Sequence, residues 1–317
     1  MRGTSPFLLR LLVVSTVFSC LSADAITQEP FRSSVDRVRV DVLVTDRGRP
    51  VTGLSASDFV LLDNDVPQRF ELVSSDEPVS VVILVDVSYS TVAYGHLATL
   101  QKGAAAVLNA LQPGEQVALM TFARGARLVV APTTDASAIR RGLSQLADTP
   151  RRRSEATALW DAVFWAAAVA RQGAGRPLVV VLSDGGDNAS WLTRRQPSEA
   201  LWVAHSKDRA VDTLVGSGIV VVVIMSPVDN RSESVADDVY GPLLSDEVAE
   251  RTGGESFAAT ARDLQRRVDA RFAALRAGYV LAFTPADERD GKWHTLKVRL
   301  ANRRGSVKAR PGYLAVR

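Results

Sequence analysis

Four apolar stretches, separated by segments with helical periodicity, constrain the fold of this 317-residue chain more than any other feature. The first runs from Val79 to Val85 and ends in Asp86, and the others are 116–122, 177–182 and 218–225. Near-continuous apolar runs of this length are typical of strands that are buried on both faces of a parallel sheet. We therefore expect these four stretches to be neighbouring strands of one sheet.

The segments between the apolar stretches have the spacing of amphipathic helices. In Val92 to Leu111, apolar residues recur three and four positions apart, and Pro113-Gly114 ends the pattern. Further helices are expected at 136–146, 158–171, 198–215, 244–251 and 261–277. Strands that alternate with helices predict an α/β domain with a doubly wound, mostly parallel sheet over residues 78–277.

Blocks with β-strand patterning flank this domain on both sides. In the N-terminal block, residues 26–77, strands are expected near 38–44, 58–63 and 68–73. In the C-terminal block, residues 278–317, they are expected near 279–283, 294–300 and 307–313. Each block has about three strands, which is few for an independent sheet. We expect the two blocks to pair into one β-sandwich, with the α/β domain inserted between them.

The first 25 residues have the pattern of a signal peptide. Arg2 and Arg10 flank the apolar run Leu11 to Leu21, and Ala23-Asp24-Ala25 has the small-x-small form of a cleavage site. The run is shorter than the about 20 apolar residues that span a membrane. We therefore expect an exported protein, periplasmic or extracellular, with no transmembrane span after signal removal.

The single cysteine, Cys20, lies within this segment, so the mature chain would have no disulfide. Val17-Phe18-Ser19-Cys20 loosely resembles a bacterial lipobox, which leaves a lipoprotein anchored at Cys20 as an alternative. Phe18 is bulky where that motif prefers small residues, so a cysteine in the apolar part of a cleaved signal peptide is the favoured interpretation.

Charge argues against a nucleic-acid partner. The chain has 38 Lys and Arg against 35 Asp and Glu, a formal charge of +3, and its basic clusters are short and lack interleaved aromatic residues. No oligomeric state follows from the sequence.

Polar residues gather where the predicted strands end. Asp86, Ser88 and Ser90 follow the first apolar stretch, Asp184 follows the third, and Thr157 precedes a predicted helix. Ligands of open α/β sheets bind outside the carboxyl ends of strands, where the strand order reverses. If the strands before Asp86 and Asp184 are neighbours across that point, all these residues meet in one crevice.

These five side chains offer only oxygen ligands, two carboxylates and three hydroxyls. Such a set suits Mg²⁺ or Mn²⁺ and does not suit zinc. The hydroxyls would ligate without neutralising the ion. The alternative without a metal is that Asp86 and Ser88 simply cap the following helix, since Asp and Ser are favoured at the N-cap position.

The five residues, in order, resemble the metal-ion-dependent adhesion site (MIDAS) of von Willebrand factor type A (VWA) domains, which has the pattern Asp-x-Ser-x-Ser, a distant Thr and a further Asp. The resemblance implies that Ser88 and Ser90 bind the metal directly, that Asp86 and Asp184 often bind it through water, and that Thr157 binds in either way. Ala156 departs from the family, which often has Gly at that position.

The layout of the whole chain resembles the exported VWA-related proteins of acidobacteria. The motifs that carry this resemblance include Asp58-Phe59, Tyr279-x-Leu-x-Phe-Thr-Pro285, Asp290-Gly291-Lys292-Trp293-His294 and Ala309-Arg310-Pro311-Gly312-Tyr313. That family implies no established activity.

The leading functional hypothesis is a binding module, not an enzyme. It would hold Mg²⁺ or Mn²⁺ and capture an Asp or Glu side chain of a partner protein, for adhesion or for assembly of an envelope complex. The alternatives are a metal-dependent hydrolase or phosphotransferase and a structural envelope protein with a merely stabilising metal. The sequence has no Gly-x-Ser-x-Gly elbow, P-loop or His-Glu-x-x-His motif, which speaks against catalysis.

A few other polar and aromatic residues are assigned no functional role. His96, His205 and His294 are isolated in the sequence and are expected on the surface or in packing positions. Asp187 could support the site indirectly, but an acidic loop residue after Gly-Gly is expected to be solvated. Trp191 could line the crevice, but packing is its expected role.

Overall fold

The computed structural model describes residues 37–73, 77–148, 156–187, 189, 205–226, 246–260, 262–285 and 290–315. The described residues belong to one compact unit. The expected signal peptide with Cys20, the arginine cluster 151–153 and Trp191 lie outside them. Among the described helices, none has the length and apolar character of a membrane span.

A six-stranded sheet forms the centre of the α/β domain, in the order β11-β10-β9-β6-β7-β8. Its strands are β6 (Val79–Asp86), β7 (Gln116–Phe122), β8 (Ala126–Thr133), β9 (Arg176–Ser183), β10 (Val220–Met225) and β11 (Glu255–Ala258). All pair in parallel except β8, which is antiparallel to β7. Every residue of β6 is buried, which explains why this stretch is apolar without alternation.

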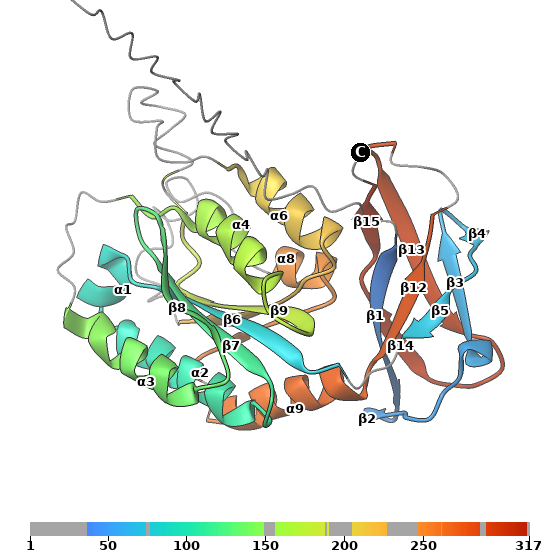
Figure 1. The fold of residues 1–317 in the computed structure, drawn as a ribbon, viewed down its shortest axis with the longest axis horizontal. Helices are drawn as coiled ribbons and strands as arrows, with labels where there is room; N and C mark the ends of the chain where they lie inside the picture. The colour runs from blue at the N-terminus through green and yellow to red at the C-terminus, as the bar shows by residue number, and fades with distance from the viewer. Residues whose placement is uncertain are drawn as a thin grey trace, which may run out of the picture. The chain divides into compact units, whose positions relative to one another are not determined.

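Helices cover both faces of this sheet, with α2, α3 and α9 on one face and α4 and α6 on the other (Figure 1). The helices are α1 (Tyr89–Ala93), α2 (Leu97–Ala110), α3 (Ala136–Ser144), α4 (Leu159–Ala170), α6 (Lys207–Gly216), α8 (Asp246–Arg251) and α9 (Leu264–Ala277), with a 3-10 turn, η2 (Gln145–Asp148), after α3. The prediction of a doubly wound, mostly parallel α/β domain is therefore confirmed.

Several local features differ from the predictions. The final strand expected near 307–313 is divided into two strands, Ser306–Ala309 and Gly312–Leu314, which lie in different sheets. Strand β11 was not predicted. The helix expected over Val92 to Leu111 is split into α1 and α2, because Gly95 adopts a positive φ of 76° and interrupts it. Strand β8 was not predicted. It is the edge strand of the sheet, its residues are only partly buried, and it contains Pro132, so it lacks the pattern of a buried strand.

The two β-rich blocks share both sheets of a β-sandwich. One sheet has the order β14-β1-β12-β5, with β2 beside β1, and the other has the order β15-β13-β3-β4. The strands are β1 (Val38–Asp46), β2 (Arg49–Pro50), β3 (Phe59–Asp63), β4 (Val66–Pro67), β5 (Glu71–Val73), β12 (Tyr279–Phe283), β13 (Trp293–Leu300), β14 (Ser306–Ala309) and β15 (Gly312–Leu314), and a 3-10 turn, η1 (Ala56–Asp58), precedes β3. Strand β5 is shorter than the expected 68–73.

Antiparallel pairing joins the N-terminal strands to the C-terminal ones. Val40 lies opposite Leu281, and Leu61 lies opposite Val298. The rings of Phe59 and Tyr279, from the two sheets, pack with centroids 5.1 Å apart. The predicted pairing of the two blocks is thus confirmed, while the domain limits at 78 and 277 stay predictions.

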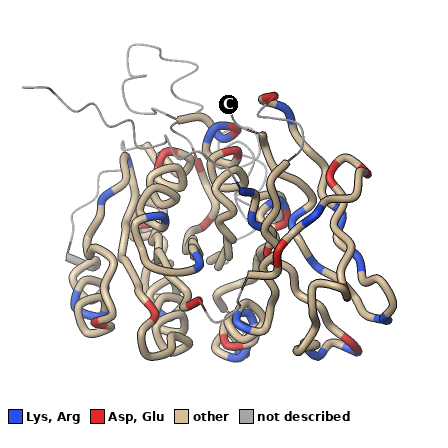
Figure 2. Tube along the Cα trace, turned by 45° about the vertical axis from the view of Figure 1, so that its right-hand side comes forward, with Lys and Arg blue, Asp and Glu red and all other residues tan. Residues whose placement is uncertain are grey.

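Basic and acidic residues are spread over helices and strands alike (Figure 2). Some basic residues, however, are buried where the sandwich meets helix ends. Arg310 donates to the carbonyl oxygen of Val215 in α6 and, at 2.7 Å, to that of Arg39 in β1. Arg176 donates to the carbonyl oxygen of Leu275 in α9 and to the carboxylate of Asp41. These side chains link the sandwich to the α/β domain.

Candidate metal centre

The carboxyl ends of β6 and β9 lie side by side in the centre of the six-stranded sheet. Val85 of β6 pairs with Leu182 of β9, and the two strands are parallel. From β6 the sheet continues to β7 and β8 on one side and to β9, β10 and β11 on the other, so the strand order reverses between β6 and β9. Asp86 ends β6 and Asp184 directly follows β9. The topology therefore brings these two carboxylates to one edge of the sheet.

Asp86 is the most deeply buried member of the set, with an exposed fraction of 0%. Its Oδ1 accepts a hydrogen bond of 2.8 Å from the backbone N–H of Ser88, and its Oδ2 accepts one of 2.7 Å from the hydroxyl of Ser183. Burial, together with the negative charge of Asp184, raises the pKa of Asp86 to about 7.

Hydroxyl groups connect the two ends of the motif. Ser90 Oγ donates to Asp184 Oδ2 at 2.8 Å, and Ser88 Oγ lies 3.1 Å from Ser90 Oγ. The backbone N–H of Gly186 donates to Asp184 Oδ1 at 3.2 Å. Asp86, Ser88, Ser90 and Asp184 thus form one polar cluster, in which Ser90 and Asp184 are only partly buried.

Thr157 is buried and lies two residues before helix α4. The backbone N–H of Ala189 donates to the carbonyl oxygen of Thr157 at 3.1 Å, which joins the threonine segment to the loop that follows β9. The N–H of Ala158 donates to the carbonyl oxygen of Ala123 at 2.7 Å, just after β7. The backbone therefore holds Thr157 beside the loops at the carboxyl ends of β7 and β9.

The chemistry of this cluster fits a hard divalent cation. The hydrogen bonds to Asp86 and Asp184 given above come from hydroxyl and backbone N–H groups, which carry no compensating positive charge. The ionised form of the buried Asp86 is unfavourable because it has lost water and lies near the negative charge of Asp184. A bound cation would offset both the cost of burial and the repulsion between the two carboxylates. In the described part of the chain no group of three or more His, Cys, Asp or Glu side chains gathers as a metal site, so hydroxyl ligands would have to complete the set.

Two residues that the sequence analysis left out of the candidate site also lie at this centre. Ser183 donates to Asp86 and accepts a hydrogen bond of 2.9 Å from the N–H of Gly185. Asp187 was expected to be solvated, which was wrong: it has an exposed fraction of 3%, and its Oδ2 accepts a hydrogen bond of 3.1 Å from the N–H of Trp160. In the sequence, these two residues are marked only by their position beside Asp184. Polar residues in such a loop are usually exposed, so their burial could not be predicted.

Two histidines, which were expected either on the surface or in packing positions, are buried next to aspartates. His205 Nδ1 lies 2.7 Å from Asp161 Oδ1, and its ring stacks on Phe164 with centroids 3.4 Å apart. These contacts join α4 to the segment just before α6, which starts at Lys207. Packing, the other expected role, is the one that the structure supports.

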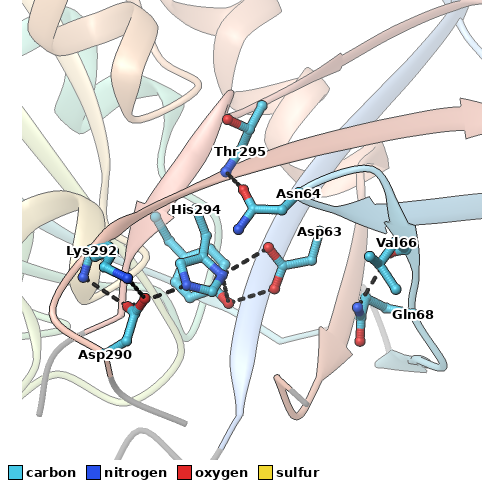
Figure 3. Close-up of polar contacts among 9 residues, drawn as sticks. Asp63, Asn64, Val66, Gln68, Asp290, Lys292, His294 and Thr295 are labelled. Carbon is cyan, nitrogen blue, oxygen red and sulfur yellow. Dashed lines mark hydrogen bonds and ion pairs between the residues drawn. The ribbon is translucent and has the colours of Figure 1, made fainter. Parts of the chain in front are cut away.

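His294 lies in the sandwich, between two aspartates (Figure 3). Its Nδ1 is 2.9 Å from Asp63 Oδ1, and its Nε2 is 3.4 Å from Asp290 Oδ1. Tyr313 donates to Asp63 Oδ2 at 2.7 Å. This polar group therefore connects β3, β13 and β15 inside the sandwich, which gives the His294 and Tyr313 motifs a packing role.

Residues 81–186 match the family model described as the von Willebrand factor type A domain. This range includes most of β6, all of β9 and all five candidate ligands. Together with the doubly wound sheet, the match shows that the chain contains a VWA domain, as the sequence predicted. No curated protein matches the chain.

Several solved structures are similar to this chain at low identity. A conserved hypothetical protein, BatB, from Bacteroides thetaiotaomicron is 18% identical with a TM-score of 0.44, over 62% of this chain and 98% of the other. The vWF domain of the type V pili tip protein Mfa5 from Porphyromonas gingivalis is 11% identical with a TM-score of 0.42, over 63% and 95%. A von Willebrand factor type A protein from Catenulispora acidiphila is 13% identical with a TM-score of 0.40, over 88% and 72%.

Proposed function

We propose that this protein is an exported binding module that holds Mg²⁺ or Mn²⁺ and captures an acidic side chain of a partner protein. Asp86, Ser88, Ser90, Thr157 and Asp184 would hold the ion. The observation that carries the proposal is the 2.8 Å hydrogen bond from Ser90 to Asp184, which joins residues 94 positions apart in the sequence. It brings the two halves of the motif together at the reversal of strand order.

The uncharged hydroxyl ligands are what would let this site recognise a partner. The three hydroxyls bind a cation without cancelling its charge, so the ion retains affinity for a further carboxylate. Asp86 and Ser88 are buried, whereas Ser90 and Asp184 are partly exposed. An Asp or Glu of a partner protein would therefore approach from the side of Ser90 and Asp184. The role of the bound ion is to supply a positive centre for that carboxylate.

A catalytic role has less support at this site. Hydrolysis or phosphoryl transfer needs a positioned base or nucleophile beside the metal. The candidate ligands are two carboxylates and three hydroxyls, with no histidine or lysine among them. Metal-dependent turnover of a phosphate or peptide substrate, abolished by Asp86→Ala, would favour an enzyme instead.

Thermal unfolding tests the metal site directly. Wild type, Asp86→Ala and Ser88→Ala are compared in EDTA, in Mg²⁺ and in Mn²⁺. The control is Asp212→Ala, which changes a partly exposed residue of α6 that pairs with Arg251 of α8 and is no candidate ligand. A cation at about a hundred times its Kd adds roughly 2.7 kcal/mol of stability, which raises the melting temperature by several degrees. We expect this rise in wild type and Asp212→Ala and its loss in the other two variants. Equal curves in EDTA and in metal for wild type would contradict the proposal.

Capture experiments test the second half of the proposal. Wild-type protein and Asp86→Ala are used as bait in Mg²⁺ and in EDTA, and the captured partner is then changed at its Asp and Glu residues. We expect capture that requires Mg²⁺, Asp86 and one acidic residue of the partner. Identical partners for wild type and Asp86→Ala would refute partner capture, and metal binding without any carboxylate-dependent partner would select the structural alternative.

A further inference from the structure

Helix α4 begins without a cap of its own, immediately after the candidate ligand Thr157. Its N-cap residue is Ala158, whose methyl side chain accepts no hydrogen bond. Helices usually begin with Ser, Thr, Asp or Asn, because the side-chain oxygen satisfies one of the free N–H groups of the first turn. The twelve residues of α4 are mostly buried, so an unsatisfied first turn would be costly here.

Asp187 supplies the missing cap from another segment. Its Oδ2 accepts the hydrogen bond of 3.1 Å from the N–H of Trp160, the second residue of α4, although the two residues are 27 positions apart. The carboxylate also places a negative charge at the positive end of the helix dipole, where it is stabilised. Asp187 is buried, so this contact is poorly screened by water.

This cap acts on the backbone that carries Thr157. The loop from Asp184 to Asp187 starts at a candidate ligand and ends at the cap of α4. A second contact, from the N–H of Ala189 to the carbonyl oxygen of Thr157, joins the same two segments at 3.1 Å. The position of Thr157 relative to Asp184 is therefore determined by bonds that include the Asp187 cap.

We propose that Asp187 is a positioning residue of the metal centre, which places Thr157 beside Asp184 by capping α4 from the loop after β9. The inference rests on the proposed function, because it concerns the same cation. Asp187 itself is no ligand in this proposal, since it acts through the first turn of α4. Residues that orient metal ligands without touching the ion typically change metal affinity by roughly 10-fold to 100-fold when they are replaced.

The experiment compares three variants of the full chain. Asp187→Ala removes the cap, while Asp187→Asn keeps a side-chain oxygen that accepts from the N–H of Trp160. Asp135→Ala is the matched control, because Asp135 caps α3 through a hydrogen bond of 2.8 Å from the N–H of Ser137. It removes the same kind of contact from a helix that carries no candidate ligand.

Two measurements are made on each variant: Mn²⁺ affinity by titration calorimetry, and hydrogen exchange of the Trp160 amide in EDTA. We expect Asp187→Ala to weaken Mn²⁺ binding by roughly tenfold or more and to speed exchange at Trp160. Asp187→Asn should recover most of the affinity, and Asp135→Ala should bind Mn²⁺ as wild type does. Rescue by Asn separates a cap from a role of the negative charge.

The outcomes distinguish this inference from the proposed function. If wild type binds Mn²⁺ and Asp187→Ala binds it equally well, the role given to Asp187 is refuted and the metal site stands. Unchanged exchange at Trp160 in Asp187→Ala, or loss of affinity in Asp187→Asn as large as in Asp187→Ala, also refutes it. A third outcome is that neither wild type nor Asp135→Ala binds Mn²⁺, although Asp187→Ala still speeds hydrogen exchange at Trp160. In that case the proposed function fails, and Asp187 is a helix cap without a role in metal binding.

Discussion

At the scale of single residues, the two carboxylates of the candidate metal centre differ in their exposure to solvent. Asp86 is fully buried, and Asp184 is partly exposed. Among the described residues, the groups that bond to Asp86 are a hydroxyl and a backbone N–H, so its ionised form is stabilised there by hydrogen bonds but not by a cation. The ionised Asp86 therefore destabilises the metal-free fold, and a bound cation would reverse this effect.

The pH dependence of stability follows from the raised pKa of Asp86. The pKa rises from an ordinary value of 3.8 to about 7 on folding, so the folded protein binds more protons than the unfolded chain within this window. Its stability in EDTA should then fall as the pH rises from about 4 to about 7. Asp86→Asn lacks this titration, so we expect the variant to melt above wild type in EDTA at pH 8.

Melting curves of wild type and Asp86→Asn between pH 4 and pH 8 provide the measurement. Saturating Mg²⁺ at pH 8 should reverse the order, because only wild type would gain from the ion. Two pH profiles that run parallel in EDTA would show that Asp86 does not control this part of the stability.

At the scale of elements, the alignment of β6 with β9 decides where the two carboxylates lie. The N–H of Arg176 donates to the carbonyl oxygen of Pro78 at 2.8 Å, where both strands begin. Gly175, just before β9, has a φ of 115°, and a Cβ at this residue would lie 2.0 Å from the same carbonyl oxygen. Only glycine permits this close approach of the two chains, so the register between Asp86 and Asp184 depends on it.

Replacing Gly175 by alanine should therefore destabilise the protein more than an ordinary glycine substitution. We expect Gly175→Ala to lower the free energy of unfolding by about 3 kcal/mol or more, because a backbone clash adds to the strain of a positive φ. Gly114→Ala is the control: Gly114 also has a positive φ, of 90°, but no atom lies within 4 Å of its Cβ position. Gly114→Ala should cost about 1 kcal/mol, from the strain of a residue with a Cβ at a positive φ. Urea unfolding measures both, and equal costs would argue against the close approach.

At the scale of the whole molecule, basic residues join the sandwich to the α/β domain, and two of them, Arg176 and Arg310, are buried. Lys308 donates to the carbonyl oxygen of Gly254 at 2.8 Å, and Arg310 and Arg176 donate to carbonyl oxygens near the C-terminal ends of α6 and α9. Positive charge is favourable at helix C-termini, where carbonyl groups lack partners within the helix. Burial lowers the pKa of Arg310 to about 10, so it stays charged at neutral pH.

Loss of the Arg310 charge should weaken this junction. Arg310→Met removes the buried side-chain donor to the carbonyl oxygens of Val215 and Arg39, and we expect a loss of about 3 kcal/mol in the free energy of unfolding. Arg303→Met is the control, because the exposed Arg303 side chain pairs with Asp58 at 3.0 Å, and its loss should cost much less than that of Arg310. Chemical unfolding measures the difference. Equal losses for both variants would mean that the sandwich contact at Arg310 contributes little.

Much of the architecture was predictable because burial leaves a direct pattern in the chain. Strands β6, β7 and β9 are buried on both faces, and their apolar runs marked them within a residue or two. Strand β8 escaped prediction because its residues at the sheet edge are only partly buried. The Asp86, Ser88, Ser90, Thr157 and Asp184 pattern could also be found, since its members directly follow strands or precede a helix.

Local pattern was thus sufficient for the doubly wound domain, the flanking β blocks and the candidate ligands. The tertiary fold alone decided which distant groups meet: Ser183 with Asp86, Asp187 with the first turn of α4, and Arg310 with the end of α6. The physical reason is that hydrophobic periodicity depends on neighbours along the chain, whereas a hydrogen-bond partner depends on how the elements pack in space. A polar residue in a loop has the same local sequence whether water or a helix N-terminus satisfies it.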